Sequence, residues 1–368
     1  MSLSPGRFFL PGPTEVHPSV LEAQARPVIG HRGPEMRALM ERLQPGLQDV
    51  FRTRRPVMVS TSSATGLMEG AVRGGVRRRL LCLVNGAFSE RFATIAAGCG
   101  VPHEILEVAW GNVHDPGAVA DRMAAGSFDA VSLVHSETST GALNPVESLV
   151  EAIRQFPDVQ VLVDSVTGIG GAPFLTDEWG VDLVLTGSQK ALALPPGLAF
   201  GVASEAFLER ANSLEGRGMY LDVVGFYQQL AKSQTPTTPA VTLLYALEEQ
   251  LKRIEAESME GRWARHGEMS RRTCDWVDEL GHRLELDLHV LAPEGGRSPT
   301  VTCIRLPVDL EGPRVVSAMR ERGWVIGGGY GKLKPNCIRI GHMGDHTVEQ
   351  LEELLDVLEQ VIRKETGT

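Results

Sequence analysis

Cysteine is scarce in this sequence, and its spacing argues against a disulfide framework. Five cysteines occur among 368 residues and no two of them form a CxxC pair: Cys82, Cys99, Cys274, Cys303 and Cys337. Small secreted domains that depend on disulfides carry many more cysteines in a much shorter chain. Four of the five lie in apolar or glycine-rich surroundings that predict burial. We therefore expect reduced, buried thiols and a cytoplasmic protein.

Long hydrophobic runs are also missing. A transmembrane helix needs about 18 or more consecutive apolar residues, and no stretch of the chain approaches that length. The first residues, MSLSPGRFF, lack the apolar segment of a signal peptide. The sequence therefore predicts no membrane partner.

The chain has no excess of basic residues. It contains 36 Lys and Arg against 46 Asp and Glu, which gives a net charge of −10. The densest basic runs are RTRR at 52–55 and RRR at 77–79, and such short runs are typical of solvated helix ends or turns. Without a basic stripe, a nucleic-acid partner is not expected.

Short apolar or β-branched runs alternate with helix-like segments between residues 57 and 204. The runs are VMVST (57–61), LLCLVN (80–85), DAVSLVHS (129–136), VQVLVDS (159–165), VDLVLTG (181–187) and LAFGVAS (198–204). This alternation indicates an α/β fold with a mostly parallel, doubly wound sheet, whose strands are covered on both faces. A helix is predicted over residues 34–51, whereas the Pro- and Gly-rich residues 1–30 are expected to be extended.

The pattern changes near Pro239. A helical segment covers residues 240–280, long enough for two helices or one bent helix, and strand-like and helix-like segments then follow in α+β order. We expect a large domain over residues 15–245 and a smaller α+β domain over residues 246–368, joined by the N-terminal segment 1–14.

Small, hydroxylated and glycine-rich segments follow the predicted strands. In an open α/β sheet, ligands bind beyond the carboxyl ends of the strands. The segments in that position are SSATG (62–66), NGAF (85–88), ETSTG (137–141), DSVTG (164–168) and GSQK (187–190). We expect the functional site to be built from them.

Asp164 and Lys190 stand out in these segments. Each alone has an ordinary explanation, since Asp is a common cap or turn residue and a lysine near a strand end is usually solvated. Lys190, however, is followed by ALALPPG. Such apolar surroundings desolvate an ammonium group and lower its pKa, so that the neutral amine can act as a nucleophile.

A lysine that forms a Schiff base and a carboxylate that pairs with a pyridinium nitrogen are together typical of a pyridoxal phosphate (PLP) site. The phosphate of this cofactor also needs hydrogen-bond donors. The segment SSATG precedes a helix-like segment and offers backbone N–H groups and two hydroxyls, Ser63 and Thr65, where a helix dipole favours an anion. The pattern predicts PLP as cofactor and no metal.

Five stretches make the chain resemble the class V aminotransferases of PLP fold type I, and within them the alanine–glyoxylate / serine–pyruvate aminotransferase group. They are PGPTEVHPSV, GHRGPEM, HSETSTG, VDSVTGIGGAP and GSQKALALPPGLAF, of which the last two are the most specific. The resemblance runs from Pro11 to Gly344. It implies a large PLP-binding domain, a smaller domain and ping-pong transfer of an amino group from alanine or serine to glyoxylate or pyruvate.

The resemblance also implies roles for individual residues at the cofactor. Lys190 would form the Schiff base and move protons, and Asp164 would pair with the ring nitrogen. The other implied cofactor contacts are Ser63, Ala64, Thr65 and Gln189 at the phosphate, Phe88 and Val166 at the ring, and Thr138 at the phenolic oxygen.

Further implied contacts come from a second subunit and from the smaller domain. Thr238 matches a phosphate ligand supplied across a homodimer, and Thr235 stands where some relatives place a tyrosine, which leaves a second such contact open. Arg339 matches the arginine that binds the substrate carboxylate, in line with the bidentate geometry of a guanidinium. Gly12 is expected at a pocket wall that suits a small substrate.

Other chemistries remain open from the sequence. The fold also supports cysteine desulfurases and lyases, for which Cys337 is the candidate nucleophile by position, and class V aminotransferases with aspartate, 2-aminoethylphosphonate or ureidoglycine as donor. The segment TGIGGAP (167–173) superficially resembles a dinucleotide fingerprint, but Pro173 stands where its third glycine belongs. A regulatory protein of this fold would carry an added DNA-binding region, and none is recognisable.

Overall fold

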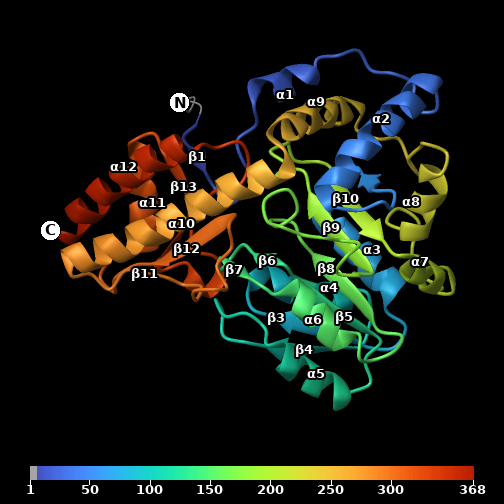
Figure 1. Cartoon of the computed structure of the whole chain (residues 1–368), viewed down its shortest axis with the longest axis horizontal. Coiled ribbons are helices and arrows are strands. Elements are labelled where there is room, and N and C mark those ends of the chain that lie inside the picture. The colour runs from blue at the N-terminus through green and yellow to red at the C-terminus, as the bar shows by residue number, and fades with distance from the viewer. Residues whose placement is uncertain (1–5) are drawn as a thin grey trace.

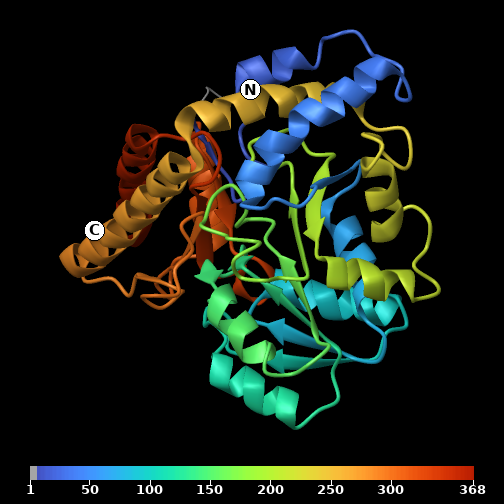
Figure 2. The ribbon, with the colours of Figure 1, turned by 45° about the vertical axis from the view of Figure 1, so that its right-hand side comes forward.

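The computed structural model describes residues 6–368, so residues 1–5, which begin the predicted segment 1–14 and the MSLSPGRFF stretch, lie outside the described residues. Two large sheets, each packed against helices, form most of the structure (Figures 1 and 2), and β6 (Ser136–Glu137) and β7 (Ala142–Leu143) pair in a separate two-stranded sheet. A seven-stranded sheet is built from strands between residues 58 and 203. A five-stranded sheet combines a strand near the N-terminus with strands from residue 289 onward.

The seven-stranded sheet has the order β2-β10-β9-β8-β5-β3-β4. Its strands are β2 (Met58–Ser60), β3 (Leu80–Val84), β4 (His103–Glu107), β5 (Ala130–Val134), β8 (Gln160–Asp164), β9 (Leu183–Gly187) and β10 (Ala199–Ala203). Strand β10 is antiparallel to both neighbours, and the other pairs are parallel. The predicted mostly parallel α/β sheet is confirmed, with β4 as an unpredicted edge strand.

Helices cover both faces of this sheet (Figure 1). One face packs against α2 (Pro34–Phe51), α5 (Pro116–Ala124), α6 (Val146–Ile153) and α9 (Val241–Glu257), and the other against α3 (Ala64–Gly75), α4 (Ala87–Gly98), α7 (Glu205–Asn212) and α8 (Val223–Leu230). Successive strand residues alternate between the two apolar layers, as Leu81 and Leu83 do against Leu80 and Cys82. Burial of both strand faces explains the uninterrupted apolar runs of the sequence.

The five-stranded sheet has the order β1-β13-β14-β12-β11. Its strands are β1 (Phe8–Phe9), β11 (His289–Val290), β12 (Val301–Arg305), β13 (Val325–Gly328) and β14 (Cys337–Gly341), and its apolar cluster includes α10 (Met259–Leu284), α11 (Gly312–Glu321) and α12 (Val348–Thr366). The domain limit between residues 245 and 246 stays a prediction. Helix α9 runs across that limit and packs on the seven-stranded sheet. Within residues 6–368, no helix combines the length and the apolar character needed to cross a bilayer.

Two segments refine the expectations from sequence. Residues Pro18–Ala23 form helix α1 where an extended chain was expected, because Pro18 occupies the first helical position and the Ser19 N–H donates to the His17 ring at 3.2 Å. The helical segment after residue 240 divides at Ser258 into α9 and α10, where a φ of +65° takes the backbone out of the helix. The Ser258 hydroxyl then accepts the Gly261 N–H at the start of α10.

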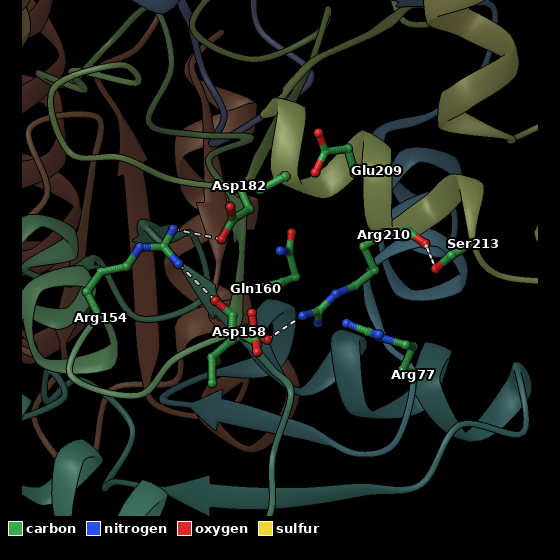
Figure 3. A pocket seen from close by; sticks show the side chains of 10 residues that line it. Arg77, Arg154, Asp158, Gln160, Asp182, Glu209, Arg210 and Ser213 are labelled. Carbon is green, nitrogen blue, oxygen red and sulfur yellow. Dashed lines mark hydrogen bonds and ion pairs between the residues drawn. The ribbon is translucent and has the colours of Figure 1, made fainter.

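A polar cavity of about 410 Å³ lies at the amino ends of β8 and β9, the edge opposite to the predicted site (Figure 3). Arg210 in its wall is 6% exposed. The Arg210 guanidinium lies 3.5 Å from the Asp129 carboxylate and donates to the Asp129 carbonyl at 2.6 Å. Asp129 also accepts the backbone N–H groups of residues 77–79. This network ties the start of β3 and β5 to α7.

Replacing Asp129 by alanine should lower the midpoint of urea unfolding. The change leaves the buried Arg210 charge without its carboxylate and three N–H groups without their acceptor, and breaking a buried pair typically costs about 3–5 kcal/mol. Glu209→Ala, which removes an exposed carboxylate from the same cavity, is the matched control and should leave the midpoint nearly unchanged. Equal shifts in the two variants would contradict this account.

Candidate active site

A cavity of about 230 Å³ lies beyond the carboxyl ends of β2, β5, β8 and β9. The structure brings ten of the predicted site residues together in its wall: Gly12, Ser63, Ala64, Thr65, Phe88, Thr138, Asp164, Val166, Gln189 and Lys190. They meet because parallel strands end at the same sheet edge, and because β2 runs parallel to β9 through the intervening antiparallel β10. Segments far apart in sequence, from Ser63 to Lys190, therefore share one pocket, and Gly12 joins them from the loop after β1 (Phe8–Phe9).

The Lys190 side chain is held out of water in this cavity. It is 9% exposed, and its Nζ donates to the Pro11 carbonyl at 2.5 Å and lies 5.9 Å from the centre of the Phe88 ring. Burial, followed by the charge of Arg339, lowers the pKa of Lys190 to about 8. Gly12 makes room for the amine, since a Cβ at this residue would lie 2.4 Å from Nζ, and its φ of +99° also favours glycine.

Asp164 ends β8 with its carboxylate in the same cavity. It is 4% exposed, and its side chain accepts one hydrogen bond among the described residues, from the Val166 N–H to Oδ1 at 2.8 Å. Burial raises the pKa of Asp164 to about 7, although the Val166 hydrogen bond opposes this shift. A buried carboxylate with so few donors is suited to a ligand that brings a cationic N–H group.

The two helix starts beside the cavity differ in what they bind. At α4, the Glu137 carboxylate accepts the N–H groups of Phe88 and Ser89 at 3.1 and 2.8 Å. At α3, Ser63 occupies the N-cap position without a capping side-chain hydrogen bond, and the N–H groups of Ala64 and Thr65 have no partner among residues 6–368. The start of α3 is therefore open to an anion.

Arg91 is a site residue that the sequence analysis missed. It lies on α4 one turn after Phe88, with its guanidinium 4.9 Å from the Phe88 ring centre and Nη1 3.3 Å from the Thr65 hydroxyl. The i,i+3 spacing of an aromatic residue and an arginine on a predicted helix was the signal that could have found it. Four further cavity residues were also not predicted: Met68, Val134, Ser136 and Thr167.

Arg339 does not line the cavity wall, but it contacts Thr138, which does, from the five-stranded sheet. It lies on β14, where Nε donates to the Gly328 carbonyl at 2.8 Å and Nη1 to the Thr138 carbonyl at 3.0 Å. Its guanidinium lies 5.6 Å from the Tyr330 ring centre. Nη2 has no hydrogen bond among the described residues, so the head group retains a free donor edge.

Of three further predicted threonines, one lies in the cavity wall and two do not. The Thr138 hydroxyl lies in the cavity wall and forms a hydrogen bond with the Thr167 hydroxyl at 2.9 Å. Thr235 and Thr238 do not line this cavity: Thr235 is buried and donates to the Thr237 carbonyl, and Thr238 is exposed. Their contact with a second subunit stays a prediction.

The structure weighs against two alternative chemistries. The Cys337 thiol is fully buried in a cluster with Cys303 and Leu333, so it cannot act as a mobile nucleophile without a local rearrangement. Residues 167–173 continue β8 as turns and a bend rather than as a helix. The helix start that binds a pyrophosphate in dinucleotide folds is therefore not formed there.

Comparison with known proteins gives a consistent result over nearly the whole chain. The sequence model of the family described as Aminotransferase class-V matches residues 93–326. The chain is 36% identical to an uncharacterised aminotransferase of Methanocaldococcus jannaschii (92% of this chain, 87% of the relative) and 31% identical to the L-aspartate–glyoxylate aminotransferase of Paracoccus denitrificans (92% and 87%). The solved alanine–glyoxylate aminotransferase of Nostoc sp. superposes with a TM-score of 0.91 at 30% identity, over 99% of this chain and 98% of that one.

Replacing Asp164 by asparagine should raise the melting temperature of the ligand-free protein, and by more at pH 8 than at pH 5. Since the pKa of Asp164 rises from 3.8 to about 7 on burial, ionisation favours the unfolded chain, and this penalty grows as the pH rises through that interval. The full effect should be on the order of a few kcal/mol.

Asp345→Asn is the matched control for this experiment. Burial raises the pKa of Asp345, but the charges of Arg262 and Arg253 and the hydrogen bonds from Arg262 and Gln250 together outweigh burial and lower the pKa below 3.8. This carboxylate therefore stabilises the fold above that pH. The control should therefore lower the melting temperature at pH 8. If Asp164→Asn raised the melting temperature equally at pH 5 and pH 8, Asp164 would not be a destabilising buried charge.

Proposed function

This chain belongs to the class V aminotransferases, enzymes of PLP fold type I, and from that premise we propose that it moves the amino group of alanine or serine to glyoxylate or pyruvate. The proposal rests on the shared cavity of Lys190 and Asp164, an amine and a carboxylate that are both buried and that each have one hydrogen-bond partner among residues 6–368. Transamination needs these two groups on opposite sides of one flat cofactor.

The described residues fit PLP. The Asp164 carboxylate oxygen Oδ2, which accepts no hydrogen bond among the described residues, suits a protonated ring nitrogen. The N–H groups at the start of α3, which have no partner among residues 6–368, suit a phosphate together with Thr65 and Gln189. Phe88 and Val166 would contact the ring, Thr138 its phenolic oxygen, and Lys190 would attach it as a Schiff base. Bound there, PLP supplies an electron sink for the charge left when a proton leaves the substrate Cα.

Lys190 is proposed to hold and move the proton of the reaction. Because burial lowers the pKa of its amine to about 8, roughly a tenth of it is neutral at pH 7, compared with fewer than about one molecule in a thousand at the ordinary value of 10.5. The Pro11 carbonyl orients Nζ within the cavity. A neutral, oriented amine could accept a proton from the substrate Cα and pass it to the C4′ carbon of the cofactor.

Arg339 is proposed to bind the substrate carboxylate. Two of its nitrogens are held by the Gly328 and Thr138 carbonyls, which fix the plane of the guanidinium and leave Nη2 available. Since Arg339 lies on β14 and Lys190 follows β9, a bound substrate would bridge the two sheets. Gly12 keeps the pocket wall beside the amine small, which suits alanine or serine.

A homodimer and a cytoplasmic location are part of the proposal. The exposed position of Thr238 on the loop before α9 supports its role as a phosphate ligand in the cavity of a second subunit, with Thr235 beside it. The five free thiols, four of them buried, support a reducing environment.

Aspartate as the amino donor is a second candidate. It is favoured by Arg91, a second cation in the cavity wall that could bind a side-chain carboxylate, and by the similarity to an L-aspartate–glyoxylate aminotransferase. The contact of Arg91 with Thr65 at the start of α3 instead favours a role at the phosphate.

The proposed function predicts an absorbance change of the PLP-loaded enzyme on adding alanine or serine without an acceptor, reversed by glyoxylate or pyruvate. Lys190→Ala should slow this change by roughly 100- to 10,000-fold while the protein still retains the cofactor noncovalently. The exposed Lys232 provides the control, and Lys232→Ala should react at the wild-type rate. A wild-type enzyme that responds to neither alanine nor serine, or a Lys190→Ala variant of full activity, would refute the proposal.

Arg91→Gln distinguishes the two donors. If Arg91 serves the phosphate, as we expect, the variant should lose PLP more readily on dialysis and show similar KM values to wild type for alanine and aspartate once saturated with PLP. A selective rise of about tenfold or more in the KM for aspartate would instead assign Arg91 to a substrate carboxylate. Arg73→Gln, which removes an arginine of α3 outside the cavity, is the control.

A further inference from the structure

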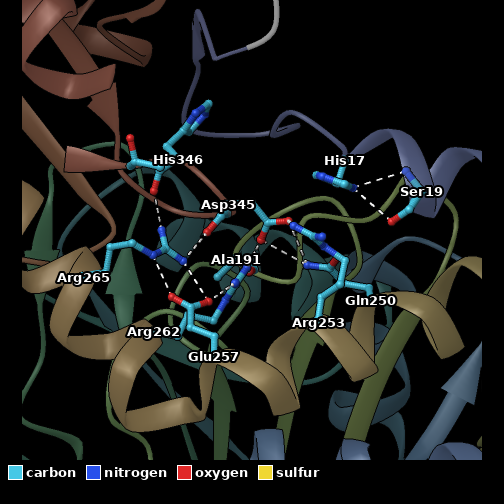
Figure 4. Close-up of polar contacts among 12 residues, drawn as sticks. His17, Ser19, Ala191, Gln250, Arg253, Glu257, Arg262, Arg265, Asp345 and His346 are labelled. Atoms are coloured by element: carbon cyan, nitrogen blue, oxygen red, sulfur yellow. Dashed lines mark hydrogen bonds and ion pairs between the residues drawn. The ribbon is translucent and has the colours of Figure 1, made fainter. Parts of the chain in front are cut away.

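A cluster of charged side chains lies where α9 meets α10, beside the turn that carries Lys190 (Figure 4). We define the Arg262 cluster as Arg253, Glu257, Arg262, Arg265 and Asp345, which are linked by ion pairs. Arg262, on the first turn of α10, is 1% exposed. So deeply buried a guanidinium depends on protein partners for its charge. Nη1 and Nη2 have such partners, whereas Nε has none among the described residues.

The Arg262 guanidinium joins three segments that are distant in sequence. Nη2 donates to the Ala191 carbonyl at 2.7 Å and lies 2.9 Å from the Asp345 carboxylate, and Nη1 lies 2.8 Å from the Glu257 carboxylate. Ala191 directly follows Lys190, Glu257 ends α9, and Asp345 lies in the loop after β14, the strand of Arg339. One side chain thus connects the Lys190 turn to the element that carries the proposed substrate-binding arginine.

The other two arginines of the cluster do not share this connection. Arg265 donates to the Gly344 and His346 carbonyls and pairs with Glu257, and Arg253 pairs with Asp345 at 3.2 Å. No hydrogen bond among the described residues joins either of them to residues 189–194. They therefore provide variants that disturb the same cluster without touching the Lys190 turn.

The Lys190 turn depends on such contacts to keep its shape. Ala193 is fully buried and has a φ of +50°, a strained value for a residue other than glycine. On one side, Thr14 binds the Gln189 and Lys190 carbonyls through its N–H and hydroxyl at 3.0 and 3.1 Å. On the other side, the bond from Arg262 to the Ala191 carbonyl holds the turn.

We propose that Arg262 is a positioning residue for Lys190, and that it links the position of the amine to the loop after β14. This inference rests on the proposed role of Lys190. Arg262 is not among the main charges that act on the Lys190 amine, which are Arg339, Asp164, Arg91 and Glu137. A change in the titration of Lys190 when Arg262 is replaced therefore reports a change in the position or solvation of the amine.

The first measurement uses the protein freed of PLP. The extent of Lys190 acetylation by acetic anhydride is followed against pH by mass spectrometry, for wild type, Arg262→Gln, Arg262→Lys and the control Arg253→Gln. The wild-type midpoint should lie near the pKa of about 8. Arg262→Gln should move it upward by about one unit, because a loosened amine gains contact with water. Arg262→Lys should show a smaller shift, and Arg253→Gln none.

The second measurement uses the PLP-loaded enzyme. Arg262→Gln should lower kcat about tenfold or more and change the KM for the donor less than about twofold, since the misplaced group acts in the chemical step and Arg339 is retained. Arg253→Gln should keep kcat near the wild-type value even where its melting temperature falls as far as that of Arg262→Gln.

The outcomes separate positioning from simple stabilisation. A lowered melting temperature of Arg262→Gln with an unchanged Lys190 midpoint and unchanged kcat would overturn the proposal. If Arg262→Gln does not fold, Arg262→Lys is the deciding variant. A wild-type Lys190 midpoint together with a wild-type kcat in Arg262→Lys would then overturn the proposal. A shifted midpoint in a protein whose wild type has no transaminase activity would support positioning and refute the proposed function instead.

Discussion

The exclusion of water from one amine, Nζ of Lys190, is the constraint on which the rest of the site depends. An ammonium group at the end of a strand would normally be solvated, and here it is buried against the Pro11 carbonyl in a pocket that only a glycine at residue 12 leaves open. Burial lowers its pKa to about 8, which gives it a usable neutral fraction near physiological pH. The β2–β10–β9–β8 order then brings a carboxylate and an open helix start to the same sheet edge.

The buried charges of the molecule fall into two groups with different physical roles. Arg210 with Asp129, and Arg262 with Asp345 and Glu257, are paired and support the packing of segments that are distant in sequence. Asp164 instead receives one hydrogen bond from the part of the chain that the structure describes, and burial raises its pKa to about 7. A fold that leaves such a group unsatisfied loses stability at that point, and unsatisfied polar groups of this kind are expected where a ligand completes the site.

Much of this arrangement was predictable from the sequence, because it depends on local patterns. The apolar runs located the central strands, and the rule that ligands bind at their carboxyl ends selected the segments that hold nine of the ten predicted cavity residues, all but Gly12. The roles of the individual residues came from the resemblance to the class V aminotransferases. Strand β4 was missed because it lies at the sheet edge with alternating exposed residues and gives no apolar run. Glu137 and Arg262 were missed because their partners, the α4 start and the Ala191 carbonyl, lie 48 and 71 residues away. Arg91 could have been predicted from helical periodicity, because it lies one turn after Phe88.

The most direct test of the account is the chemical identity of the residue that binds the cofactor. The PLP-loaded protein is reduced with borohydride, digested, and its peptides are weighed by mass spectrometry. The mass of the reduced cofactor should be found on the peptide that contains Lys190 and on no other. Label on a different lysine, or an unlabelled Lys190 in protein that demonstrably retains PLP, would contradict it.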